Sequence, residues 1–245
     1  MRVLRLAPAV VGAVLVATPL HPLFGQLFEG VLGMRIREVP SEIQAFVKGN
    51  KVRMELATPA GPGAFILNPA GGENYLVLSS QQLVMVMKTA DLAQVVDSLA
   101  KARGVGEGEL VVTGRKDHVA GHDCQIHRFQ DREGVMDLCL ASGLGKLGGA
   151  AALFGNPTAG MGAMGGMGGG RARAGPGSGA PAWARELARK GGFPLRVADS
   201  AGTVHWEVTS VERKRLDDSL FAPPAAFQRM DMPGFGRRPP RDRGR

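Results

Sequence analysis

Residues 47–56 read VKGNKVRMEL, and this stretch decides the class of fold. The KGN tripeptide at 48–50 is typical of a tight hairpin turn joining a strand over 42–47 to a strand over 51–57. Apolar and charged residues alternate along the second strand, with Val52, Met54 and Leu56 on one face and Lys51, Arg53 and Glu55 on the other. This period of two predicts an antiparallel sheet with one buried and one wet face.

Segments on both sides of this hairpin repeat the pattern. Short runs of strand composition are separated by turns rich in Gly, Pro, Asn and Ser, such as NPAGG at 68–72. Further strands are predicted over 28–39, 64–68, 75–78, 82–87, 109–113, 123–130, 135–141, 193–199 and 204–214, and helices over 91–103, 142–155 and 183–190. Strands and helices do not alternate as βαβ units. We therefore expect a mainly β fold, and not a Rossmann or barrel enzyme.

The predicted helix over 91–103 has one apolar stripe. It begins near Thr89 or Asp91 and ends at Gly104, and its stripe follows a helical period. The stripe residues, with two methionines just before the helix, are the candidate ligand-contacting residues: Met85, Met87, Leu92, Val95, Val96 and Leu99. Two interpretations stay open, because the same stripe describes ordinary core and the lining of a cavity for an acyl chain. Methionine is deformable and suits variable apolar ligands.

The first 26 residues are typical of a secretory signal peptide. Arg2 and Arg5 precede a mostly apolar stretch over 6–20, which is shorter than the ~20 residues of a spanning helix. Cleavage after Gly25 or Gln26 leaves a single β domain over 27–232; the alternative is an uncleaved membrane anchor. No cysteine lies directly after the apolar stretch, so we expect an exported protein of the periplasm or cell envelope without a lipid anchor.

The net charge of +8 is concentrated outside the predicted domain. Its excess lies in the N-terminal segment, in a glycine-rich segment over 156–181 and in an arginine-rich tail over 233–245. Both of the latter are predicted to be disordered. The tail is suited to an anionic membrane surface. The remainder is nearly neutral and poor in aromatic residues, so we expect no nucleic-acid partner.

No arrangement of residues predicts catalysis, a metal site or a cofactor. The polar cluster at 117–127 contains three histidines and one cysteine but lacks a closed zinc spacing, and is interpreted as polar residues around a turn. The MGAMGGM run at 161–167 is interpreted as low-complexity linker and not as a copper site. Asp217 and Asp218 are interpreted as a helix or turn cap and not as catalytic carboxylates.

Four stretches together resemble a known family. They read VKGNKVRMEL at 47–56, GHDCQIHRF at 121–129, GGFPLRV at 191–197 and VHWEVTSVERKRLDDSLFAPPAAFQRMDM at 204–232. They are similar to an exported bacterial family catalogued as domain of unknown function 4412, which is related to lipid carriers of the LolA and LppX type. The resemblance implies a strongly curved antiparallel sheet or half-barrel with one or two helices on its concave face. It implies no functional residues, and the insertion over 156–181 has no counterpart in the carriers.

The resemblance leads to two functional hypotheses. The first is an exported, non-enzymatic binding protein that holds a lipid or another apolar small molecule in the half-barrel. The alternative is a structural or interaction protein of the cell envelope whose core is filled by its own side chains. The volume and lining of the concave face would distinguish the two.

Cys124 and Cys139 are predicted to form a disulfide. An exported protein folds in an oxidising compartment, and these are its two cysteines. They lie on strands that flank a turn near residues 131–134. A two-residue turn at Asp131-Arg132 places the cysteines directly opposite one another, whereas a three-residue turn over 132–134 offsets them by three positions and onto opposite faces.

Overall fold

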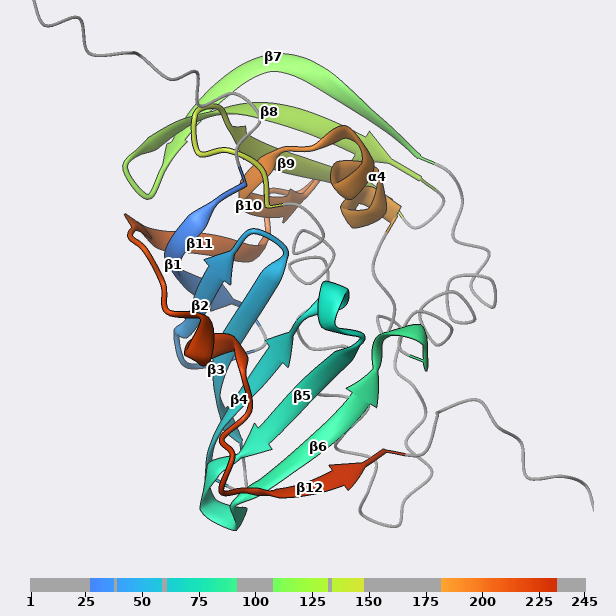
Figure 1. Ribbon diagram of the computed structural model, residues 1–245. Coiled ribbons are helices and arrows are strands. Elements are labelled where there is room, and N and C mark those ends of the chain that lie inside the picture. Colours follow the sequence, from blue (N-terminus) through green and yellow to red (C-terminus); the bar gives the residue numbers. More distant parts are fainter. Residues whose placement is uncertain are drawn as a thin grey trace, which may run out of the picture.

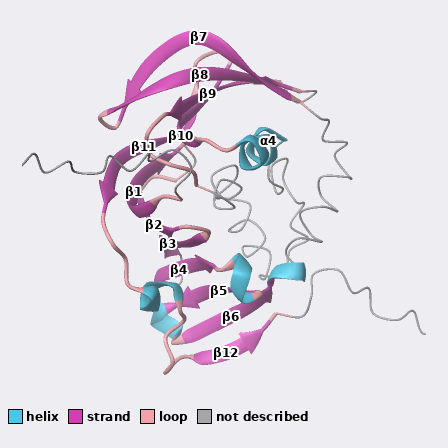
Figure 2. Cartoon of the chain, turned by 45° about the horizontal axis from the view of Figure 1, so that its top comes forward, coloured by secondary structure: helices cyan, strands magenta, loops and turns pink. Residues whose placement is uncertain are grey.

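Residues 27–37, 39–58, 61–91, 108–131, 134–147 and 182–232 are described by the structure, which is a computed structural model. This part of the chain forms one twelve-stranded sheet in the order β12-β6-β5-β4-β3-β2-β1-β11-β10-β9-β8-β7. The sheet is strongly curved and open, because its first and last strands do not pair (Figures 1 and 2). The prediction of a mainly β fold with a curved sheet is therefore confirmed, and the pairing is antiparallel except between β12 and β6, which run parallel.

The strand bounds match most of the predicted ones. They are β1 Glu29–Ile36, β2 Ile43–Lys48, β3 Lys51–Thr58, β4 Gly61–Leu67, β5 Glu73–Leu78, β6 Leu83–Lys88, β7 Glu109–Val119, β8 His122–Gln130, β9 Val135–Ala141, β10 Phe193–Asp199, β11 Val204–Arg213 and β12 Gln228–Asp231. The α-helix with described bounds is α4, Ala182–Lys190, as the sequence predicted. In the first hairpin Lys48 pairs with Lys51, and Gly49 takes the left-handed conformation (φ +62°) that this tight turn requires.

Several predictions fall on residues outside the described part of the chain. These are the signal peptide over 1–26, the helix beyond Asp91, the glycine-rich segment over 156–181 and the tail over 233–245. The described residues of the weak helix predicted over 142–155 contradict that prediction. Ser142 to Leu144 form a bend and Lys146 forms an isolated bridge with Leu27. The glycines in this stretch explain the difference, because glycine disfavours helix.

β1 lies at the centre of the sheet and joins its two halves. Strands β1 to β6 run as a meander in sequence order, and β7 to β11 form a second meander. The two meanders meet where β1 pairs with β11 in antiparallel register, with Leu32 opposite Val211 and Ile36 opposite Trp206. One sheet therefore carries both halves, although the strands that connect them lie far apart in the sequence.

Helix α4 packs against the concave face of the second half (Figure 2). Its residues Trp183 and Leu187 are buried in the same apolar cluster as the inward-facing residues of the strands. The Trp183 ring lies 6.5 Å from the Trp206 ring of β11, centroid to centroid. The charged side of α4 faces outward, where Glu186 pairs with Arg189 and Lys190 at 2.7 and 3.1 Å.

The opposite, outer face of the first half is covered by residues 214–231, here called the C-terminal strap. After β11 the strap crosses in front of β3, makes the short 3₁₀ helix η4 (Asp218–Phe221) and ends as β12 beside β6 (Figure 1). It buries Leu216 and Phe221 against a second apolar cluster on the outer face, formed by Ala64, Ile66, Val77, Val84 and Val86. Strands β4 to β6 are thus apolar on both faces, which explains their continuous hydrophobic runs.

Polar contacts attach the strap to β1, β2 and β3. Lys48 Nζ donates to the Leu216 carbonyl at 2.8 Å, and the Leu216 amide donates to Glu29 at 2.8 Å. Asp218 accepts from Lys51 at 2.9 Å and lies 3.2 Å from Lys48. Asp217 caps η4 by accepting from the Ser219 amide at 2.8 Å. The interpretation of Asp217 as a turn cap is confirmed.

We expect the ionic attachment of the strap to depend on pH. Hydrogen bonds from Lys51 and Lys48 hold the pKa of Asp218 below its ordinary value. A carboxyl whose pKa is depressed by folding stabilises the fold above its unfolded pKa, and this contribution disappears as the pH falls through the folded pKa. Asp218→Asn should therefore lower the urea midpoint at neutral pH. In acid, once Asp218 of the wild type is protonated, the two proteins should have the same midpoint.

The control is Asp231→Asn, which changes an exposed aspartate at the end of β12. We expect its urea midpoint to follow the wild type throughout the titration. An Asp218→Asn deficit that persists unchanged into acid would contradict the ionic origin of the contact.

The disulfide between Cys124 and Cys139 is present, but neither predicted register occurs. The loop between the strands spans residues 131–134, so Cys124 lies opposite Ala141 and Cys139 lies opposite Ile126. The cysteines are therefore offset by two positions. That offset keeps both side chains on one face, and the twist of the curved sheet brings this diagonal to a Cα–Cα distance of 5.4 Å, which a disulfide spans.

Candidate functional site on the concave face

An unbroken row of apolar residues crosses the concave face of the first half. Leu32 lies opposite Ala45, and the same register line continues through Met54, Phe65 and Leu76. The complete row, from β11 to β12, is Val211, Leu32, Ala45, Met54, Phe65, Leu76, Met85 and Met230. Its six inner members are buried, and Met230 at the edge is 46% exposed. The row provides a continuous apolar surface across eight strands.

A second row crosses the other half and ends in polar surroundings. It consists of Ile36, Trp206, Val197, Leu138, His127 and Val112, each opposite the next on the neighbouring strand. The first four are buried, His127 is half-buried and Val112 is 52% exposed. Helix α4 packs on this half through Trp183, whose ring contacts Trp206 of the second row.

The predicted ligand-contacting residues are only partly described. Met85 is buried in the first row, and Met87 lies half-buried on the same face two positions further along β6. Leu92, Val95, Val96 and Leu99 lie outside the described residues. The sequence prediction did not name the other row members. The sequence shows the alternation within each strand, but it does not show which strands are neighbours in the sheet.

His127, a member of the second row, is the titratable group of that row whose pKa is shifted. Burial and the charge of Lys190 both lower the pKa of His127, with burial the larger cause. Lys190 projects from the end of α4, and its ammonium lies 3.4 Å from the Leu110 carbonyl of β7 and 3.1 Å from Glu186. We expect His127 to be neutral at pH 7 because its charged form is penalised.

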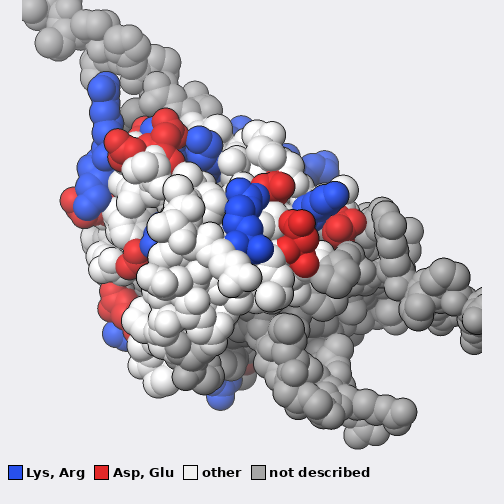
Figure 3. All heavy atoms as spheres, turned by 60° about the horizontal axis from the view of Figure 1, so that its bottom comes forward, with Lys and Arg blue, Asp and Glu red and all other residues white. Residues whose placement is uncertain are grey.

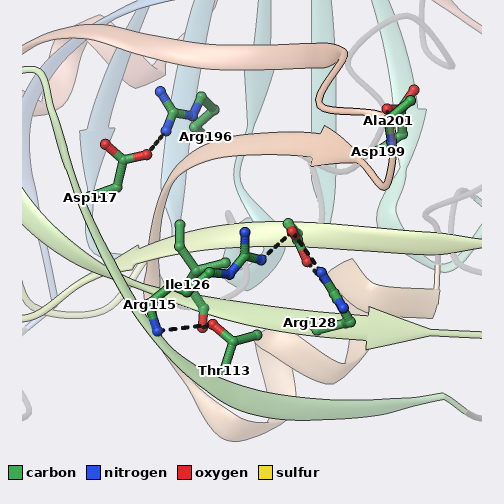
Figure 4. Close-up of polar contacts among 9 residues, drawn as sticks. Thr113, Arg115, Asp117, Ile126, Arg128, Arg196, Asp199 and Ala201 are labelled. Carbon is green, nitrogen blue, oxygen red and sulfur yellow. Dashed lines mark hydrogen bonds and ion pairs between the residues drawn. The ribbon is translucent and has the colours of Figure 1, made fainter.

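The outer face of β7 to β10 carries ion pairs and not an apolar row (Figure 4). Asp137 accepts from Arg128 at 2.9 and 3.1 Å and also pairs with Arg115. The hydrogen bonds from Arg128 are the largest cause of the lowered pKa of Asp137, which remains ionised at neutral pH. Arg196 pairs with Asp117 and lies 3.6 Å from Glu207. Each of these charged side chains is paired with a side chain of opposite charge, which suits a structural role for the group.

The polar cluster at 117–127 is divided among separate partners. The sulfur of Cys124 is bonded to Cys139, and Asp117 pairs with Arg196. His118 Nδ1 lies 2.8 Å from Asp123, where both side chains are exposed. Among the described residues, no three His, Cys, Asp or Glu side chains converge as metal ligands would.

Basic and acidic side chains are interspersed on the surface. The face drawn in Figure 3 shows Lys and Arg next to Asp and Glu without an extended area of one sign. The arginine-rich segments that carry the net charge lie outside the described part of the chain. Within that part, no helix combines the length and apolar character needed to cross a bilayer.

Three solved structures have similar chain arrangements. An uncharacterized conserved protein from Thermus thermophilus is 12% identical, with a TM-score of 0.44 over 82% of this chain and 89% of that one. Two crystal forms of PNGF-II are 13% and 14% identical, with TM-scores of 0.39 and 0.38 over 84% of this chain. This chain spans only 30% and 31% of their length. No curated protein matches the sequence.

A family model matches residues 28–164 and 166–227. The matched range contains the central pair of β1 and β11, both rows of the concave face except Met230, and the strap as far as Phe227. It also contains the four stretches on which the sequence resemblance rested, apart from the last residues of the fourth. The chain belongs to the family described as Domain of unknown function (DUF4412).

Proposed function

We propose that this protein is an exported, non-enzymatic binding protein that holds a lipid or another apolar molecule against the concave face of its curved sheet. In this proposal the fold is a half-barrel of the LolA type. The observation that carries the proposal is the apolar row through Leu32, Met54, Phe65, Leu76 and Met85. This row has no polar residue, and because its inner members are buried, the proposal requires the concave face to open before an acyl chain contacts them.

Methionines support the same proposal. Met34, Met54 and Met85 are buried in the concave-face cluster, and Met87 packs against it. Their flexible thioethers adapt to ligands of different shape better than branched side chains do. A face that combines adaptable and rigid apolar side chains suits a class of apolar compounds and not one substrate with fixed polar groups.

The disulfide supports the proposed location. Disulfides persist in oxidising compartments, which agrees with the signal peptide expected over 1–26. We place the protein in the periplasm or cell envelope, without a lipid anchor. The arginine-rich tail over 233–245 would hold it near anionic membrane surfaces, where a lipid ligand is available.

A second function is favoured by the contacts of α4. Trp183 packs on Trp206 and Leu187 is fully buried, so the concave face of the second half is covered by the protein itself. A structural or interaction protein of the cell envelope would need no more than such a filled core. The two functions differ in what occupies the first half.

Compounds that copurify with the protein test the proposal directly. We expect native mass spectrometry and solvent extraction of protein purified from an exporting host to detect a bound apolar compound. Met85→Trp adds bulk at the concave row and should weaken binding of the apolar compound about tenfold, a loss of about 1.4 kcal/mol of binding free energy, because the larger ring takes space that the ligand would occupy.

Phe46→Trp is the matched control, because Phe46 packs on the outer face under the strap. It also introduces a tryptophan, but on the outer face, so it should leave the bound fraction unchanged. Repeated absence of any bound compound from the wild type would overturn the proposal and favour the filled-core function.

A further inference from the structure

Four methionines lie side by side where β12 pairs with β6. The two strands run parallel, with Met230 opposite Met85. The Met232 amide donates to the Val86 carbonyl at 3.0 Å, which continues the same register and places Met232 opposite Met87. The two pairs of methionines are far apart in the sequence and adjacent in the sheet (Figure 1). They are here called the methionine group.

The methionine group lies on the concave face and is open to solvent on one side. Met85 is buried in the concave-face cluster, and Met87 and Met232 pack against it half-buried. Met230 lies two positions before Met232, on the same face, and is 46% exposed. Neighbouring strands are about 4.8 Å apart and positions two apart on a strand about 6.6 Å, so the four side chains start from the corners of a small rectangle. Their flexible thioethers can turn toward its centre.

Packing alone does not account for this composition. β-branched residues are favoured in strands, and the outward positions of β6 follow that preference with Val84 and Val86. The inward positions of the same segment are Met85 and Met87. β12 is polar at its other positions and exposed throughout, yet it places Met230 inward. Branched apolar residues would fill these inward positions equally well, but they would supply no sulfur.

The surroundings of the methionine group suit a soft metal ion. Thioether sulfur is a soft, uncharged ligand that selects Cu(I). On the β5 side the group adjoins Leu76 and Asn74. The Asn74 side chain accepts from the Asn68 amide at 3.1 Å and donates to the Thr89 hydroxyl at 3.2 Å, so its polar atoms are already engaged. An ion at the centre of the group would therefore be held by sulfur, in mainly apolar surroundings.

We propose that the methionine group binds one Cu(I) ion, with the thioethers of β6 and β12 as its ligands. This site goes beyond the proposed function and does not depend on it. In an oxidising compartment thiols form disulfides, whereas thioethers remain available as ligands. The exposed side chain of Met230 gives the ion access from solvent.

Competition for Cu(I) with the coloured chelator bicinchoninate tests the site in the full-length protein under anaerobic conditions. The wild type should take one Cu(I) from the chelator. The double variant Met230→Leu/Met232→Leu keeps the apolar volume and removes two sulfurs. Its dissociation constant for Cu(I) should rise at least about a hundredfold, because loss of a single outer-shell partner already costs about 10–100-fold.

The matched control is Met34→Leu/Met54→Leu, which removes two buried sulfurs from β1 and β3 on the same face. Its affinity for Cu(I) should equal that of the wild type. The urea midpoint of the β12 double variant should also stay close to the wild type, because exchange of methionine for leucine costs little. That result separates a lost ligand from a lost fold.

A second control removes the other methionine run of the sequence. Met161→Leu/Met164→Leu/Met167→Leu should keep the Cu(I) affinity of the wild type, because the proposed ligands lie on β6 and β12. A wild type that takes no Cu(I) from the chelator, or an unchanged affinity in the β12 double variant, overturns the proposal. A loss of affinity in either control does so as well.

Discussion

Phe221→Ala should lower the free energy of unfolding by about 4 kcal/mol. Phe221 is 2% exposed and packs in the outer-face cluster with Ile66, Val84 and Val86, which belong to β4 and β6. Truncation leaves a cavity between the strap and the sheet that surrounding backbone cannot fill, because the strap is attached on both sides of η4. Chemical denaturation at neutral pH measures the loss.

Leu220→Ala is the matched control for this prediction. Leu220 is the preceding residue of the same 3₁₀ helix and is only half-buried. Its truncation should cost about 1.5 kcal/mol. Equal losses for the two variants would mean that η4 contributes through its backbone and not through the buried aromatic ring.

Replacing both cysteines with alanine should lower the free energy of unfolding by about 3 kcal/mol. The bridge closes a loop with a sequence separation of 15, for which the chain-entropy relation gives a value of about 3 kcal/mol. For a domain of this size the melting temperature should fall by about 10 °C. Differential scanning calorimetry of the two proteins gives both quantities.

Reduced wild-type protein is the control for the cysteine variant. Because the bridge joins neighbouring strands β8 and β9, reduction should reproduce the loss in stability without changing the far-ultraviolet circular dichroism. A double variant as stable as the oxidised wild type would contradict the prediction. Thiol titration of denatured, unreduced protein should detect no free thiol.

The sequence predicted the hairpin at 48–51 because its turn residues and its alternation agree. It also predicted α4, the existence of most strands and the pairing of the cysteines. Each of these depends on local pattern and composition. The structure extends β7 through Gly114 and Lys116 to Val119, where the charged run had ended the predicted strand. The bulge keeps these polar residues in the strand, and a bulge has no reliable signal in a single sequence.

Long-range pairing was not predictable. β12 was missed because QRMD has no alternation and is exposed throughout, and its parallel pairing with β6 depends on the path of the strap. The register of the cysteines was missed because the loop length around residues 131–134 could not be read from its composition. The concave rows were missed because each row combines residues from distant parts of the chain, as the pairing of Leu32 with Val211 shows.

The central position of β1 has a consequence for the order in which the chain folds. As the chain emerges, β1 to β6 can form a local meander, but the second partner of β1 is β11, which is made near the end. Until then β1 has an open edge, and the outer face of β4 to β6 lacks the strap that buries Ile66 and Val84. Non-local pairing of this kind makes folding slow. If the chain is exported as proposed, slow folding would leave it unfolded long enough to pass through a translocation channel, because β1 and the outer face are completed only by its last strands.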